Sequence, residues 1–217
     1  HGNHIINTSV DDYVFALDAA TGRLAWETEV LDYTVNPALQ GAGPIIANGK
    51  AISGRSCVPK GGPDACVIVA HDAVTGAELW RRRTIPAPGE PGDETWGDVP
   101  FEDRKHVGTW MPPSYDPELN LIYIGTSVTS PAPKFFLGGS DNAHLYHNST
   151  LALEVETGEI PGAGSGVGSE QDGAPGRGEA LGPAGLSIAQ RPGQIGALEL
   201  GTRQVRPPEI GPLELGL

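Results

Sequence analysis

Short apolar runs separated by turn-forming residues fill the first 160 positions of the chain. Gly, Pro, Asn and Asp bound the runs, and inside several of them apolar and polar residues alternate. Such alternation is typical of strands that bury one face, and no stretch shows the spacing of an amphipathic helix. We therefore predict an all-β structure with strands in the runs at 4–10, 13–19, 44–54, 66–73 and 121–128.

One phrase recurs three times, as ALDAATGRLAW at 16–26, AHDAVTGAELW at 70–80 and ALEVETGEIPG at 152–162. It predicts a hairpin in which a strand ends at Asp, the Thr-Gly turn reverses the chain with Gly in a left-handed conformation, and the next strand carries Trp inward. The third copy has Gly162 in place of the Trp. The predicted motif residues are Asp18, Thr21, Gly22, Trp26, Asp72, Thr75, Gly76 and Trp80.

Repeated hairpins with a large flat anchor suit sheets that pack face to face and share one continuous core. The phrase recurs after 54 and then 82 residues, which fits sheets with insertions in their loops. We predict a partial β-propeller of about three four-stranded antiparallel blades over residues 1–160. A β-sandwich is the alternative, because hairpins with Trp also occur there.

Residues 161–217 have a different composition. All aromatic residues, both cysteines and all six histidines precede them, whereas Gly, Pro, Ala, Leu and Glu dominate and LELG occurs twice. Such a segment can bury little apolar area to offset backbone entropy, so we predict a disordered low-complexity tail. It is either a natural linker or sequence read out of frame, and the abrupt change after a correctly started repeat favours the latter.

Charge and hydropathy exclude two classes of partner. The net charge of −13 and the pI near 4.7 argue against nucleic acid, because phosphate binding needs clustered Lys and Arg. No apolar run is long enough for a membrane span. The chain starts at His1 rather than Met, so we expect a piece of a longer protein whose signal segment is not included.

The only two cysteines, Cys57 and Cys66, lie in one loop rich in Pro and Gly. In an oxidising compartment they would close a short ring and fix the loop, and we predict this disulfide. Two free thiols are the alternative. No second cysteine pair or spaced His pair accompanies them, which disfavours zinc. We also expect His144 and His147 to be surface residues, and Arg81–Arg83 to form a solvated strand edge.

The repeated phrases resemble the tryptophan-docking motif of the quinoprotein alcohol dehydrogenases, eight-bladed propellers that oxidise alcohols or sugars with pyrroloquinoline quinone. The stretch GDETWGDVPFEDRKHVGTWMPPSYDPELNLIYIGT at 92–126 is similar to their segment that crosses the propeller axis, and NSTLALEVETGEI at 148–160 matches their next hairpin. The resemblance covers about residues 5–160, or three of eight blades, which implies an internal fragment of such an enzyme.

By this resemblance, Trp110 occupies the place of a Trp that lies beneath the quinone, and Thr109 beside it would donate to a cofactor oxygen. A planar cofactor needs a rigid aromatic floor, which an indole supplies. The alternatives are that Trp110 is a buried packing anchor and Thr109 an ordinary strand residue.

The family's calcium ligands, a Glu and an Asn, are not matched in this sequence. The nearest positions hold Ser56 or Cys57 and Thr129 or Ser130, which suit a hard cation poorly. We therefore expect calcium to be doubtful, with Asp64 as a replacement charge only if its loop folds back. The family's catalytic Asp would follow the third hairpin, so the fragment alone is expected to be inactive.

Two functions remain open. One is a fragment of a quinone-dependent dehydrogenase, periplasmic or facing the periplasm, with a small alcohol or sugar substrate and an electron acceptor as partners. The other is a non-catalytic propeller scaffold of the outer-membrane assembly type. The long crossing segment at 92–126 favours the dehydrogenase, because a scaffold does not need an aromatic residue at the axis.

Overall fold

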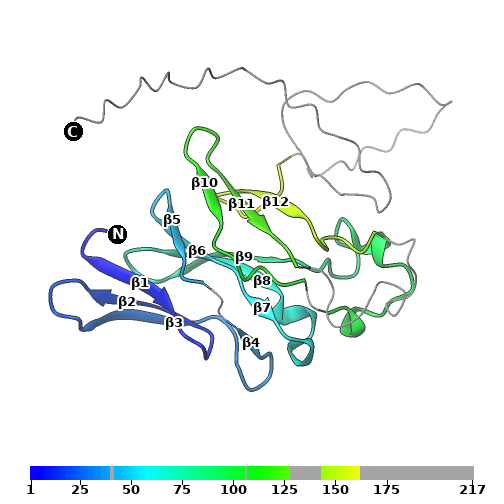
Figure 1. The fold of residues 1–217 in the computed structure, drawn as a ribbon, viewed down its shortest axis with the longest axis horizontal. Helices are drawn as coiled ribbons and strands as arrows, with labels where there is room; N and C mark the ends of the chain where they lie inside the picture. Colours follow the sequence, from blue (N-terminus) through cyan, green and yellow to red (C-terminus); the bar gives the residue numbers. More distant parts are fainter. Residues whose placement is uncertain (40–41, 106, 128–142, 162–217) are drawn as a thin grey trace, which may run out of the picture.

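The computed structural model describes residues 1–39, 42–105, 107–127 and 143–161, and these residues form antiparallel sheets (Figure 1). The strands are β1 (His4–Thr8), β2 (Tyr13–Asp18), β3 (Leu24–Glu29), β4 (Ala38–Leu39), β5 (Ile45–Ala47), β6 (Lys50–Ser53), β7 (Ser56–Cys57), β8 (Val67–Asp72), β9 (Glu78–Arg83), β10 (Ser114–Asp116), β11 (Leu121–Gly125) and β12 (Thr150–Glu154). The described part of the chain has no α-helix, and therefore none that could cross a membrane. Its 3-10 turns are η1 (Pro59–Gly61), η2 (Pro63–Ala65), η3 (Asp93–Trp96) and η4 (Phe101–Asp103).

Three sheets follow one another in chain order. The first has the order β1-β2-β3, the second β5-β6-β8-β9 and the third β10-β11-β12, while β4 and β7 form a separate pair. Figure 1 shows the second sheet between the other two. The predicted all-β partial propeller is confirmed, although only the middle sheet has four strands among the described residues.

The middle sheet is buried on both faces because its neighbours cover it. Along β8, Val67 and Val69 belong to one apolar cluster, whereas Ile68 and Ala70 belong to another. Successive strand residues point to opposite faces, so the first cluster joins the middle sheet to the first sheet and the second joins it to the third. This explains why the strand reads as a continuous apolar run instead of an alternating one.

The predicted hairpin turns are confirmed in detail. Asp18 Oδ1 accepts hydrogen bonds from the Thr21 amide at 2.8 Å and from the Thr21 hydroxyl at 2.7 Å. Asp72 makes the same contacts with Thr75, at 2.7 and 3.0 Å. These hydrogen bonds lower the pKa of both carboxyl groups. Gly22 and Gly76 follow with φ of 70° and 78°, the left-handed region in which Gly carries little strain.

Each tryptophan of the repeated phrase packs on the turn of the next sheet. A Cβ atom built on Gly76 would lie 2.4 Å from Trp26 Cε3, and one built on Gly158 would lie 2.5 Å from Trp80 Cε3. Glycine is thus required at both positions for two reasons: the turn has a positive φ there, and the indole leaves no room for a side chain. Because both indoles lie against a neighbouring sheet, they fix the order and spacing of the sheets.

Two expectations need correction or stay open. The run at 44–54 is a hairpin rather than one strand, because Asn48 and Gly49 adopt φ of 43° and 76° and reverse the chain between β5 and β6. An Asn-Gly pair is the strongest signal for such a turn. The predictions for residues 162–217, including Gly162, lie outside the described residues.

Candidate functional site

The end of the crossing segment, residues 107–110, is held between the second and third sheets. The Thr84 hydroxyl donates to Val107 O. Gly108 donates its amide to Ser127 Oγ at 2.9 Å, and the Ser127 amide donates to Gly108 O at 2.8 Å. Since Ser127 follows β11 and Thr84 follows β9, this segment takes its position from both sheets.

Thr109 is bound to the loop that follows β6. Its amide donates to Arg55 O at 2.6 Å, and the Arg55 amide donates to Thr109 Oγ1 at 3.1 Å. Thr109 is only 1% exposed, and it is not in a strand. A Cβ atom on Gly54 would lie 2.2 Å from Thr109 Oγ1, so this close approach requires glycine. The cofactor role predicted for Thr109 stays a prediction, and its observed role is to fix the segment.

Trp110 has the opposite environment. Its side chain is 50% exposed, as is that of Met111, although Thr109 immediately before it is buried. Trp110 is therefore not a buried packing anchor of the kind formed by Trp80, which is 9% exposed. A rigidly attached backbone that presents a half-exposed indole is suited to binding a flat apolar or aromatic ligand.

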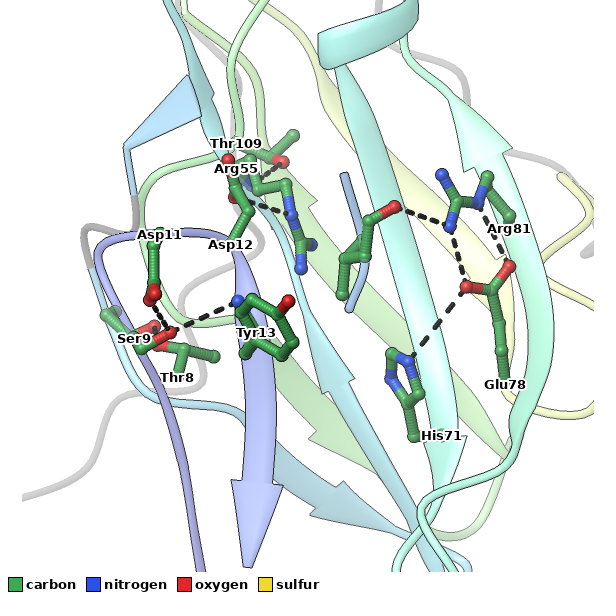
Figure 2. A network of polar contacts seen from close by, with 12 residues as sticks. Thr8, Ser9, Asp11, Asp12, Tyr13, Arg55, His71, Glu78, Arg81 and Thr109 are labelled. Carbon is green, nitrogen blue, oxygen red and sulfur yellow. Dashed lines mark hydrogen bonds and ion pairs between the residues drawn. The ribbon is translucent and has the colours of Figure 1, made fainter. Parts of the chain in front are cut away.

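A buried polar network lies behind this loop, between the first two sheets (Figure 2). Arg55 Nε lies 3.2 Å from Asp12 Oδ1, and neither side chain is exposed to solvent. Burial lowers the pKa of Arg55 to about 10, while the charge of Asp12 opposes the shift. The guanidinium therefore remains protonated at neutral pH.

His71 forms the second part of the network. Its imidazole is buried, and Nε2 lies 4.0 Å from Glu78 Oε2. Burial lowers the pKa of His71 to about 4, while Glu78 opposes the shift. Burial is the largest single influence on Glu78 and acts to raise its pKa, but the hydrogen bonds from Arg81 and the neighbouring positive charges, that of Arg81 foremost, together lower that pKa.

The predicted disulfide between Cys57 and Cys66 is present, and both residues are buried. Cys57 is therefore not a thiolate ligand for a metal. Asp64, in the same loop, pairs with Arg83 at 2.9 Å. Within the described ranges there is no group of three His, Cys, Asp or Glu residues that could hold a metal ion. Thr129 and Ser130 lie outside those ranges.

Sequence reasoning missed two features of the site. It did not identify Asp12 and Arg55, which lie 43 positions apart and carry no motif that links them. It also placed His144 at the surface, whereas this residue is fully buried and its ring centroid lies 5.0 Å from that of Trp96. The segment around His144 packs on η3, as shown by the hydrogen bond from its amide to Thr95 O at 3.0 Å. A lone His carries no periodic signal that reveals such packing.

Comparison with known proteins identifies a family that this chain matches. A sequence model described as "PQQ: Glucose/ethanol/alcohol dehydrogenase, beta-propeller domain" matches residues 32–161. The chain is 33% identical over 174 residues to quinohemoprotein alcohol dehydrogenase ADH IIB of Pseudomonas putida, covering 73% of this chain and 24% of the relative.

Solved structures agree with this match. Quinohemoprotein alcohol dehydrogenase ADHIIG from Pseudomonas putida HK5 superposes with a TM-score of 0.65 at 30% identity, over 73% of this chain and 24% of that chain. The enzyme from Comamonas testosteroni gives a TM-score of 0.63 at 26% identity, over 73% of this chain and 25% of that chain. The chain thus spans about a quarter of the length of these relatives.

Proposed function

Because the chain belongs to the glucose/ethanol/alcohol dehydrogenase β-propeller family, we propose that it is part of a dehydrogenase that oxidises alcohols or sugars with pyrroloquinoline quinone. Within this chain, Trp110 is the residue that would lie against the quinone, and Thr109 beside it would donate to a cofactor oxygen. When bound, the quinone would accept the hydride of the substrate carbon.

The half-exposed indole of Trp110 on a fixed backbone is the observation that supports this proposal. Thr109 is buried and hydrogen-bonded to Arg55 through both its amide and its hydroxyl oxygen. The residue after it therefore has little freedom, so its indole can meet a planar ligand with a small loss of entropy. The scaffold alternative offers no use for an aromatic residue held in this way.

We further propose that the 217-residue chain does not oxidise alcohols by itself. The resemblance places the catalytic base beyond the third hairpin, and oxidation requires a base to take the alcohol proton. Ser56 and the disulfide-bonded Cys57 also provide no carboxylate for calcium. Binding and turnover are therefore expected to separate in this chain.

The environment of the protein follows from the same proposal. Disulfides persist in oxidising compartments, and the Cys57–Cys66 bond supports a periplasmic location or attachment on the periplasmic side of a membrane. The partners would be a small alcohol or sugar and an acceptor for the electrons of the quinone.

Titration of the purified chain with pyrroloquinoline quinone, followed by calorimetry and by quenching of tryptophan fluorescence, tests the proposal. We expect saturable binding that Trp110→Ala weakens at least tenfold and Trp110→Phe weakens less, because the ring face is retained. Met111→Ala is the matched control, since Met111 is equally exposed and adjacent. Titrations with and without calcium measure any metal contribution.

Absence of quinone binding by the wild-type chain, or equal weakening by Trp110→Ala and Met111→Ala, would reject the assignment of Trp110. A dye-reduction assay with ethanol and glucose accompanies the titration. Alcohol-dependent dye reduction by the isolated chain would contradict the proposed separation of binding from turnover.

A further inference from the structure

Arg55 is a fully buried cation in a loop, and among the described residues its ionic partner is Asp12 of the preceding sheet. Asp12 lies in the turn between β1 and β2 and adopts φ of 69°, which is uncommon for a residue other than Gly. Among the described residues, no hydrogen-bond acceptor lies within reach of Arg55 Nη1 or Nη2. Within the part of the chain that the structure describes, the guanidinium is thus held through its contact with Asp12.

Such a pair is not explained by stability alone. Desolvation of two buried charges offsets much or all of their attraction, and an apolar pair of similar volume often gives equal stability. A buried pair that fixes one geometry has a different use, because removal of one partner leaves an unpaired charge that must move. The relevant question is therefore which part of the molecule this pair holds in place.

The backbone of Arg55 is hydrogen-bonded to Thr109, the residue that precedes Trp110. Its carbonyl and amide both bond Thr109, at 2.6 and 3.1 Å, so a shift of Arg55 must shift Thr109. The two segments pack so closely that there is no room for side chains on the glycines between them: a Cβ atom on Gly108 would lie 3.2 Å from Arg55 O, and one on Gly54 would lie 2.2 Å from Thr109 Oγ1. Figure 2 shows Arg55 between Asp12 and Thr109.

We propose that Arg55, held by Asp12, is a positioning residue that sets the orientation of the Trp110 indole. The buried ion pair ties the turn of the first sheet to the loop of the second, and the two hydrogen bonds that join the Arg55 backbone to the amide and the hydroxyl of Thr109 transmit that position to Trp110. The consequence for quinone affinity rests on the function proposed above, whereas the effect on Trp110 itself does not.

The experiment compares Arg55→Met, Arg55→Lys and Asp12→Asn in the full 217-residue chain. Each variant is also made with Trp110→Phe, so that subtraction isolates the emission of Trp110 and its quenching by acrylamide. Quinone affinity and thermal unfolding are measured on the same samples. Arg81→Met is the matched control, because Arg81 belongs to the same network and donates to Val30 O at 2.8 Å but forms no hydrogen bond with Thr109 among the described residues.

We expect Arg55→Met and Asp12→Asn to change the quenching constant of Trp110 at least twofold and to weaken quinone binding about tenfold. Arg55→Lys should restore part of both values, because it keeps the charge beside Asp12. Arg81→Met should change neither, even where it lowers the unfolding temperature. A purely structural role would instead make the quenching and the affinity follow the unfolding temperature in all four variants.

Each remaining outcome is decisive. If quinone binds and depends on Trp110, but Arg55→Met leaves its affinity and Trp110 quenching unchanged, the positioning role is wrong. If no chain binds quinone but the Trp110 quenching changes as expected, the positioning role stands and the proposed function fails. Should Arg55→Met not fold, wild-type values in both Arg55→Lys and Asp12→Asn would overturn the proposal.

Discussion

The indole of Trp80 donates a hydrogen bond from Nε1 to Val155 O at 2.9 Å, and its ring covers Gly158 in the same turn of the third sheet. Trp26 covers the equivalent turn of the middle sheet but has no hydrogen-bond partner for Nε1 among the described residues. The carbonyl that corresponds to Val155 O is Ala73 O, which lies 3.2 Å from His4 Nδ1 instead. The two junctions between sheets therefore share the stacking contact and differ in one indole hydrogen bond.

This difference predicts unequal effects of the same substitution. Trp80→Phe removes a buried hydrogen bond and leaves Val155 O without the indole donor, whereas Trp26→Phe removes none. We expect the free energy of unfolding to fall by about 1 kcal/mol more for Trp80→Phe than for Trp26→Phe. Urea denaturation followed by far-ultraviolet circular dichroism measures both, and equal losses would contradict the assignment.

Substitution of the turn glycines separates backbone strain from the contact with the indole. Gly22→Ala and Gly76→Ala each place Ala at a position with a positive φ, of 70° and 78°. Nothing lies within 4 Å of a Cβ on Gly22, whereas the Trp26 indole occupies the space of a Cβ on Gly76. Gly22→Ala should lower the free energy of unfolding by about 1–2 kcal/mol. Gly76→Ala should lower it by clearly more, because the indole must move. Similar losses in the two variants would show that the indole yields freely.

The repeated phrase allowed the hairpins, their left-handed glycines and the inward tryptophans to be predicted from sequence, because each depends on local turn chemistry. The disulfide was predictable for the same reason, since both cysteines lie in one loop. Asp12 with Arg55, and His144 with Trp96, were not predictable. These contacts join residues far apart in the chain, and their geometry arises only when neighbouring sheets pack.

The predicted site shows the same division. Trp110 could be proposed from the similarity of its segment to a known family, but its exposure and the burial of Thr109 depend on contacts with Arg55 and Ser127. Sequence alone left open whether the indole was a packing anchor. The contacts of Thr109 with the loop after β6 leave the Trp110 indole half-exposed, and this three-dimensional arrangement is what shows that Trp110 is not a buried packing anchor.

Loss of the disulfide should weaken the loop that supports Thr109. Cys57 and Cys66 close a ring over a sequence separation of nine, and such a short ring is expected to contribute about 2–3 kcal/mol to the free energy of unfolding. Double substitution with Ser, or reduction followed by alkylation, should lower the urea midpoint by a corresponding amount. An unchanged midpoint in the double variant would show that the apolar contacts of the loop suffice.

Stability should fall between neutral and mildly acidic pH because His71 is buried in its neutral form. Its pKa is about 4 in the folded protein and about 6.5 in the unfolded chain. Below pH 6.5 the unfolded chain protonates His71, whereas the folded protein protonates it only near pH 4. The free energy of unfolding therefore decreases as pH falls through this window, by up to roughly 3 kcal/mol. Asp18 and Asp72, whose pKa values are lowered, lose their stabilising hydrogen bonds only at lower pH, so they do not produce this slope.

His71→Leu provides the test, because Leu has a similar volume and no proton to bind. Urea denaturation at steps from pH 7 to pH 4.5 should give a smaller slope of stability against pH for the variant than for the wild-type chain. The imidazole resonances of His71, followed by nuclear magnetic resonance, should titrate far below those of an exposed histidine. A wild-type slope that His71→Leu leaves unchanged would mean that other groups carry the acid sensitivity and that the protein tolerates a charge at this buried position.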